Sequence, residues 1–331
     1  MTLALTAVAV PLTAQERDPG LLTLERIYGS PEFRGQFFGG TSWLEDGSGY
    51  TALEFAEGRR ARELVRYDPE TGVREVLVAA DQLTPAGGSG PLFIASYSWS
   101  EDGNKLLIFT NPQRVWRYPT RGDYWVLDLV NGKLQQLGAD LEEASLMFAK
   151  LSPDGGRAAY VSKHNIYVED LTTGQVTPLT TDGTELLING TSDWVNEEEF
   201  DLRDGFRWSP DGRHIAYWQF DSEGVSEFIL ANYTDSLYPQ VTRIPYPKAG
   251  TTNSAVRLGV VSAVGGPTTW FQIEGDPRNH YIPRMEWAAG SDEVFIQHMN
   301  RLQNTNRVLL GDVKTGKVRE VHSESDETAW V

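Results

Sequence analysis

A run of acidic residues beside aromatic ones is the segment of this sequence most suited to chemistry. Residues 193–200 read Asp-Trp-Val-Asn-Glu-Glu-Glu-Phe. Asp193 can cap a short helix, and the glutamates then lie in its first turn, where the helix dipole favours anions. Three consecutive carboxylates are usually a solvated face, but the large apolar neighbours Trp194 and Phe200 indicate a packed segment. Because partly desolvated carboxylates repel one another unless a cation lies between them, the pattern favours a site for a cation such as an α-ammonium group.

A second candidate is an arginine beside a tryptophan. Residues 114–118 read Arg-Val-Trp-Arg-Tyr. Arg117 next to Trp116 is consistent with a cation–π pair on the surface. Alternatively, the Arg117 guanidinium offers a fork of donors for a carbonyl or a carboxylate. The sequence leaves both interpretations open.

Several kinds of chemistry find no suitable residues in this sequence. A Gly-x-Ser-x-Gly nucleophile elbow is absent, since the nearest string, Gly-Gly-Ser-Gly-Pro at 87–91, lacks the final glycine. No phosphate loop or dinucleotide fingerprint occurs. The chain has no cysteine, and its five histidines lack the spacing of metal ligands. We therefore predict no catalytic residue in this chain, no metal and no cofactor.

Charge and composition limit the partners and the fold class. A formal net charge of −17 repels phosphate backbones, which argues against nucleic-acid binding. It suits cationic ligands, although solubility alone accounts for such a charge. Hydrophobic residues make up 40% and charged residues 23%, an ordinary balance for a globular protein. Aromatic residues at 11%, with 32 glycines and 17 prolines, favour many short strands joined by turns.

A repeated unit organises most of the chain. Half of it is an aromatic or apolar residue followed by a turn ending in Asp-Gly, with copies at 42–47, 98–103, 150–155 and 207–212 and a degenerate copy at 286–292. The other half is a strand running into an Asp- or Asn-containing turn that ends in Gly, with copies at 67–72, 127–132, 169–174 and 311–316. Asp-Gly supplies the positive φ that a two-residue hairpin needs, so each unit predicts four antiparallel strands.

Four-stranded repeats of this length are typical of propeller blades, which bury their faces by stacking on neighbours. We predict an all-β fold, a β-propeller with about five four-stranded blades, at 34–80, 92–138, 146–181, 204–260 and 268–322. Insertions are expected at 182–203 and 221–254. A β-sandwich is the alternative, but the recurrence of one turn chemistry at corresponding points favours the propeller.

The two ends of the chain carry separate expectations. Residues 1–15 are similar to the back half of a signal peptide, because the apolar stretch 3–12 is too short to span a membrane and the Leu-Thr-Ala string at 12–14 ends in a small residue, as a cleavage site would. A frayed apolar terminus is the alternative. We therefore predict a signal segment at 1–15, a propeller region at 16–331, and a periplasmic or secreted location. Residues 329–331 look like the interior of a sixth blade, so we expect a fragment of a longer product.

The acidic run and the arginine together resemble one family. Residues 193–200 are similar to the Asp-Trp-(Val/Leu)-Tyr-Glu-Glu-Glu motif of dipeptidyl peptidase IV and its relatives, which include fibroblast activation protein. Residues 207–217 resemble the family's Trp-Trp-Ser-Pro-Asn-Gly stretch, and 243–250 its Val-Pro-Tyr-Pro-Lys-Ala-Gly segment. Segments 22–25 and 30–33 look like the opening of bacterial members. The resemblance therefore covers nearly the whole chain.

This resemblance implies roles for individual residues. Glu198 and Glu199 match the two glutamates that bind the free N-terminus of a peptide substrate. Arg117 matches the arginine that contacts the substrate backbone carbonyl. We expect Asp193, Trp194, Glu197 and Trp116 to support these three. One departure is Asn196, where the family usually has tyrosine, which leaves open how the helix packs.

The resemblance also implies a larger enzyme. The family has an eight-bladed propeller followed by an α/β-hydrolase domain with a Ser-Asp-His triad, none of which is in this sequence, and it releases dipeptides such as Xaa-Pro and Xaa-Ala. The partners expected are peptides with a free N-terminus, that hydrolase domain, and a second copy in a homodimer of the intact enzyme. The alternative is a noncatalytic propeller of the TolB type that binds proteins. A related oligopeptidase or acylaminoacyl peptidase would not explain the acidic motif.

Overall fold

The computed structural model describes residues 20–331 apart from 34, 36–40, 45 and 59–60. The predicted signal segment at 1–15 lies outside the described residues. The chain divides into two compact units, residues 1–53 with 65–75 and residues 54–64 with 76–331. Within the described part, no helix is long and apolar enough to cross a membrane.

The first elements are a short helix and a four-stranded sheet. Helix α1 (Leu24–Gly29) is capped by the Thr23 side chain, which accepts a hydrogen bond from the Arg26 N–H at 3.2 Å. Four strands then pair in chain order: β1 (Thr41–Trp43), β2 (Tyr50–Phe55), β3 (Arg62–Tyr67) and β4 (Arg74–Val78). A 3-10 helix, η1 (Ala80–Leu83), follows. This sheet is the first predicted blade.

The second and third predicted blades are joined in one sheet. Its strands are β5 (Ser96–Trp99), β6 (Lys105–Val115), β7 (Tyr118–Asp128), β8 (Leu134–Gln136), β9 (Leu146–Leu151), β10 (Arg157–Ser162), β11 (Asn165–Asp170) and β12 (Val176–Pro178). Each blade pairs its own four strands, and β7 also pairs with β9 through Arg121 and Met147. This pairing involves the part of β7 near its hairpin, so the two blades separate beyond it.

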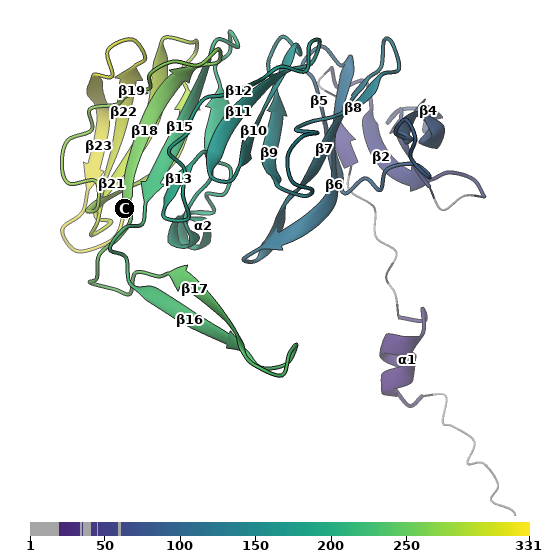
Figure 1. The fold of residues 1–331 in the computed structure, drawn as a ribbon, viewed down its shortest axis with the longest axis horizontal. Coiled ribbons are helices and arrows are strands. Elements are labelled where there is room, and N and C mark those ends of the chain that lie inside the picture. The colour runs from purple at the N-terminus through teal and green to yellow at the C-terminus, as the bar shows by residue number, and fades with distance from the viewer. Residues whose placement is uncertain (1–19, 34, 36–40, 45, 59–60) are drawn as a thin grey trace, which may run out of the picture. The chain divides into compact units, whose positions relative to one another are not determined.

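The fourth blade is a sheet of five strands rather than the predicted four, and the fifth has four. Strands of the fourth are β13 (Leu187–Asn189), β14 (Phe206–Trp208), β15 (His214–Asp221), β18 (Ala255–Ser262) and β19 (Thr269–Trp270). Those of the fifth are β20 (His280–Trp287), β21 (Glu293–Asn300), β22 (Thr305–Asp312) and β23 (Val318–Ser325). A separate hairpin of β16 (Glu227–Asn232) and β17 (Gln240–Pro245) projects from the sheets (Figure 1).

The predicted boundary between the fourth and fifth blades is wrong. Strand β19 falls in the range assigned to the fifth blade, yet it pairs with β18 of the fourth. The Trp270 ring packs edge-on against Tyr217, with centroids 5.5 Å apart, and the Arg257 guanidinium lies 3.7 Å from its centroid. Both partners belong to the fourth blade, so side-chain packing decides which sheet this short strand joins.

The hydrophobic core lies between neighbouring blades. One cluster joins Trp218 and Leu258 of the fourth blade to Ile282 and Ile296 of the fifth. Two further clusters join the second blade to the third and the third to the fourth. The Trp218 indole also donates a hydrogen bond to the Ile282 carbonyl at 2.8 Å. The predicted all-β fold, built of stacked four-stranded blades, is therefore confirmed.

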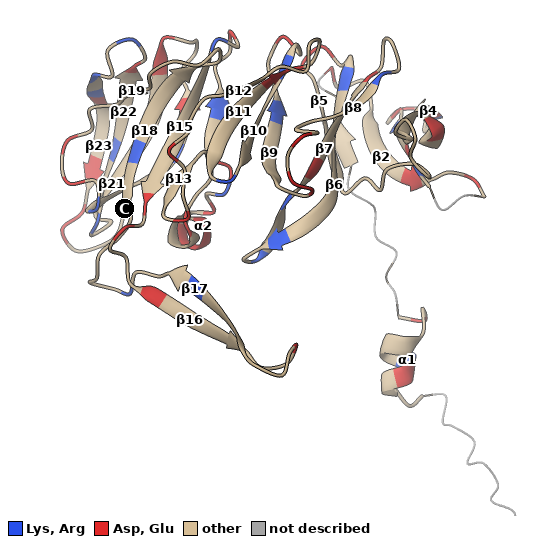
Figure 2. Ribbon diagram, in the orientation of Figure 1, with Lys and Arg blue, Asp and Glu red and all other residues tan. Residues whose placement is uncertain are grey.

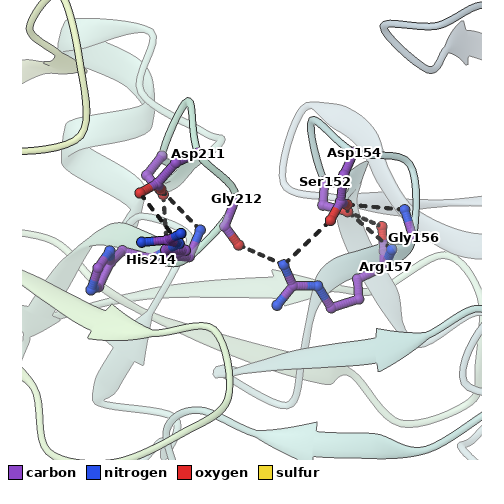
Figure 3. Close-up of polar contacts among 9 residues, drawn as sticks. Ser152, Asp154, Gly156, Arg157, Asp211, Gly212 and His214 are labelled. Atoms are coloured by element: carbon purple, nitrogen blue, oxygen red, sulfur yellow. Dashed lines mark hydrogen bonds and ion pairs between the residues drawn. The ribbon is translucent and has the colours of Figure 1, made fainter.

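The repeated Asp-Gly turns are built from side-chain hydrogen bonds. In the third blade the Ser152 hydroxyl donates to Asp154 Oδ1 at 2.5 Å and accepts from the Arg157 N–H at 3.0 Å (Figure 3). The Arg157 guanidinium donates to the Gly212 carbonyl of the fourth blade's turn at 2.7 Å. Gly155 and Gly212 have φ of 65° and 67°, as predicted. In these two blades five residues, 152–156 and 209–213, separate the strands rather than two, and the serine and aspartate side chains bridge this wider loop.

Two buried histidines of the fifth blade lead to a pH prediction. The rings of His280 and His298 meet edge to face with centroids 4.8 Å apart, and burial lowers the pKa of both, that of His298 to about 4. A depressed pKa stabilises the fold above the ordinary histidine value of about 6.5 and loses that contribution as pH falls toward 4. We expect His298→Phe to flatten the fall in Tm between these values, measured by circular dichroism. Equal slopes for this variant and for His322→Gln, an exposed control, would contradict it.

Candidate functional site

Helix α2 (Trp194–Phe200) contains the glutamate run and begins at its cap, Asp193. The Asp193 carboxylate accepts hydrogen bonds from the Asn196 backbone N–H at 3.0 Å and from the Asn196 side-chain amide at 2.8 Å. Its second oxygen accepts a hydrogen bond from the Ser254 hydroxyl. Burial raises the pKa of Asp193, and these hydrogen bonds oppose the rise. The cap therefore fixes the start of the helix to the fourth blade.

Asn196, which stands where the family usually has tyrosine, packs into the interior at the start of the helix. Its side chain is buried and closes the cap, and its backbone carbonyl accepts a hydrogen bond from the Leu202 N–H at 3.3 Å and another from the Asp201 N–H. Asp201 ends the helix in the left-handed conformation with φ of 56°. Asparagine thus contributes to both ends of this two-turn helix.

The two ends of the segment that carries α2 are joined to each other by a backbone hydrogen bond. The Gly205 N–H donates to the Gly190 carbonyl at 3.0 Å, and the Trp218 N–H donates to the Gly205 carbonyl at 3.0 Å. A Cβ on Gly205 would lie 2.7 Å from the Thr191 carbonyl oxygen, a backbone atom that has little freedom to move. The predicted insertion at 182–203 is wrong in its first part, where β13 pairs with β15 as a strand of the fourth blade. The loop that carries the helix runs from Gly190 to Gly205 and is held against β15.

The hairpin of β6 and β7 brings Arg117 to this helix. Val115 pairs with Tyr118, so Trp116 and Arg117 form a two-residue turn, with Trp116 at a φ of 40°. Arg117 Nε lies 2.8 Å from Glu198 Oε1. In Figure 2, α2 carries acidic residues and the β6–β7 hairpin carries basic ones toward its tip. The structure thus pairs Arg117 with a carboxylate of α2.

The three glutamates of the run have different environments. The Glu198 side chain is 13% exposed, and within the described residues its Oε1 has no hydrogen-bond partner, because the contact with Arg117 is an ion pair without hydrogen-bond geometry. Glu197 is buried, and desolvation raises its pKa to about 7 even though Arg203, 3.8 Å away, lowers it. Glu199 is exposed. Successive helix positions are about 100° apart, which turns one glutamate inward and another outward.

A cavity of about 340 Å³ lies beside the helix. Four of the residues singled out in the sequence line it: Trp116, Asp193, Trp194 and Glu197. Trp194 also stacks on Tyr246, with centroids 4.5 Å apart. Sequence reasoning missed four charged lining residues, namely Glu185, Arg203, Glu227 and Arg243. In the sequence, each of these residues is a single charged residue within a predicted insertion. Such a residue is most simply interpreted as part of a solvated surface.

The arrangement is suited to binding a cation rather than to breaking a bond. A shielded carboxylate oxygen without a hydrogen-bond partner accepts N–H donors strongly. No group of three or more His, Cys, Asp or Glu side chains suited to a metal occurs in the residues that the structure describes. These features define a class of protein: an all-β domain of stacked blades with an acidic helix in an insertion of the fourth blade, facing an arginine from the second.

Comparison with known proteins identifies the family. The family model for the dipeptidyl peptidase IV (DPP IV) N-terminal region matches residues 100–331, which is more than half of the chain. The chain therefore belongs to the dipeptidyl peptidase IV family, as its N-terminal region. This confirms the resemblance that the acidic motif and the arginine suggested.

Individual relatives agree with this family. Dipeptidyl aminopeptidase B of Saccharomyces cerevisiae is 31% identical over 72% of this chain and 29% of its own length. A protein of Penicillium rubens named "Probable dipeptidyl-aminopeptidase B" is 28% identical over 98% of this chain and 39% of its own. The crystal structure of Porphyromonas gingivalis dipeptidyl peptidase 4 matches with a TM-score of 0.78 and 27% identity, over 88% of this chain and 40% of that one. The chain thus spans well under half the length of these relatives.

Proposed function

We propose that this chain binds and gates peptide substrates in a serine dipeptidyl peptidase that releases Xaa-Pro and Xaa-Ala dipeptides. Glu198 and Glu199 bind the free α-ammonium of the peptide, and Arg117 orients its backbone carbonyl. Trp116, Asp193, Trp194 and Glu197 support these side chains. The site acts as a ruler, because it sets the scissile bond at a fixed distance from the N-terminus and breaks no bond itself.

One observation carries the proposal. Glu198 Oε1 is shielded and lies 2.8 Å from Arg117 Nε in an ion pair that lacks hydrogen-bond geometry, so this oxygen accepts no hydrogen bond within the described residues. An α-ammonium supplies three N–H donors and a positive charge to such an oxygen. The names of the relatives, dipeptidyl aminopeptidase and dipeptidyl peptidase, support the same substrate class.

Acetylation of the substrate tests the proposal. In the protein that carries this chain together with its hydrolase domain, we expect Gly-Pro p-nitroanilide to be cleaved about 100-fold faster than its N-acetyl form. Acetylation removes the charge and two of the donors, and each charge-assisted hydrogen bond contributes about 1.5–3 kcal/mol. Comparable kcat/KM for the two substrates would refute the proposal that the site binds the free α-ammonium group. Cleavage of neither would favour the alternative, a noncatalytic propeller that binds proteins.

Three further expectations remain proposals for the intact enzyme. We propose that its α/β-hydrolase domain holds the triad and that it is exported after removal of residues 1–15. We also propose that it forms a homodimer, supported by exposed apolar side chains on the β16–β17 hairpin, among them Ile229 and Val241. The N-terminal sequence and the molar mass in solution of the purified enzyme test the last two.

A further inference from the structure

Two neighbouring residues of the β6–β7 hairpin each meet a charged residue of the loop that carries α2. Arg117 Nε lies 2.8 Å from Glu198 Oε1. The next residue, Tyr118, has the Arg203 guanidinium 3.8 Å from its ring centroid, a cation–π distance. The hairpin tip is therefore attached to the helix segment at two adjacent points, and only the first of them belongs to the proposed substrate site.

Arg203 is anchored on the helix side of this contact. Its side chain is 22% exposed, and it forms ion pairs with Asp201 and with Glu197, the latter at 3.8 Å. Asp201 is the residue that ends α2. Carboxylates at the end and on the inner face of the helix therefore hold the guanidinium that covers Tyr118.

Arg117 has less support, since its further hydrogen bond is the one that Arg114 Nε donates to its backbone carbonyl at 3.2 Å. Its side chain is 69% exposed, and an ion pair between a long exposed side chain and a carboxylate contributes little by itself, because ordering the side chain offsets the attraction. The turn before it places Trp116 at a φ of 40°, a conformation uncommon for a residue with a bulky side chain. The position of Arg117 therefore depends on what holds the hairpin tip.

We propose that Arg203 is a positioning residue, which stacks on Tyr118 to hold the hairpin tip where Arg117 reaches Glu198 and the substrate backbone. The inference rests on the proposed function. Arg203 touches neither the peptide nor the reacting atoms in this scheme, and it acts through Arg117. Its removal should therefore matter only while Arg117 is present.

A double-mutant cycle in the intact enzyme tests this dependence. We expect Arg203→Met to lower kcat/KM for Gly-Pro p-nitroanilide about 3- to 30-fold in the wild-type background, the range for loss of a partly desolvated cation–π contact. In the Arg117→Ala background the same change should cost less than about 2-fold. Tyr118→Leu should likewise lower kcat/KM in the wild-type background and have little effect in the Arg117→Ala background. Tyr118→Phe, which keeps the ring, should retain wild-type kcat/KM. Arg213→Met removes an exposed arginine elsewhere and serves as the control.

Each outcome decides the matter. Equal losses from Arg203→Met in the two backgrounds would show a general structural defect and overturn the inference, as would no loss at all. If Arg203→Met fails to fold, Tyr118→Leu, at a half-exposed position, is judged by the same criteria. If Glu198→Gln and Arg117→Ala both left kcat/KM unchanged, the proposed function would be rejected, and this inference with it. Losses in those two variants beside a silent Arg203→Met reject the inference alone.

Discussion

Glu198→Gln is expected to lower kcat/KM for dipeptide substrates with a free N-terminus by about 10- to 100-fold in the intact enzyme. The change keeps the shape of the side chain but removes the charge of an oxygen that is shielded and has no hydrogen-bond partner in the described residues. A charge-assisted hydrogen bond of this kind contributes about 1.5–3 kcal/mol, and about 1.4 kcal/mol corresponds to a factor of ten. Since binding also sets the scissile bond, part of the loss should appear in kcat.

The comparison with the other glutamates sharpens this prediction. The family resemblance predicts a similar loss for Glu199→Gln, although Glu199 is exposed in this structure. Glu223→Gln, at another exposed position, is the matched control and should keep wild-type kinetics. Initial rates on Gly-Pro p-nitroanilide give kcat and KM, with circular dichroism to verify folding. Unchanged kinetics in Glu198→Gln and Glu199→Gln would show that the acidic run does not bind the substrate.

Asp193→Ala is expected to destabilise the protein by about 2–4 kcal/mol. The Asp193 carboxylate caps α2 and accepts three hydrogen bonds, two from Asn196 and one from Ser254. Asp193 is only 4% exposed. Loss of an N-cap costs about 0.5–2 kcal/mol, and each buried donor left without a partner adds about 1–3 kcal/mol, partly relieved by local movement. Because the helix carries Glu198, kcat/KM should fall as well.

Urea unfolding followed by tryptophan fluorescence measures this effect. Asp193→Asn keeps the capping oxygen for the Asn196 N–H, so we expect it to lose less than half as much stability as the alanine variant. Asp140→Ala replaces an exposed aspartate between β8 and β9 and should leave the midpoint unchanged. A midpoint for Asp193→Ala equal to that of Asp140→Ala would show that the cap is dispensable.

Local features of this protein could be predicted from the sequence alone. The four-stranded blades, the helix beginning at Asp193 and the positive φ of the turn glycines are all present. Each depends on residues close in sequence: alternating burial along a strand, a side chain bonded to a backbone N–H three residues on, or a glycine free of Cβ clashes. The length of the turns was mispredicted, because the serine and aspartate bonds that widen them depend on side-chain geometry.

Only the tertiary structure decided which of these local pieces meet. The pairing of Arg117 with Glu198 and the stacking of Arg203 on Tyr118 join different blades. The assignment of β19 to the fourth blade likewise follows from the packing of Trp270. The sequence of the acidic run does not predict which of its glutamates faces the interior. Such contacts depend on how blades stack and on how far a helix has rotated when its cap is fixed, and those quantities come from packing between segments distant in sequence.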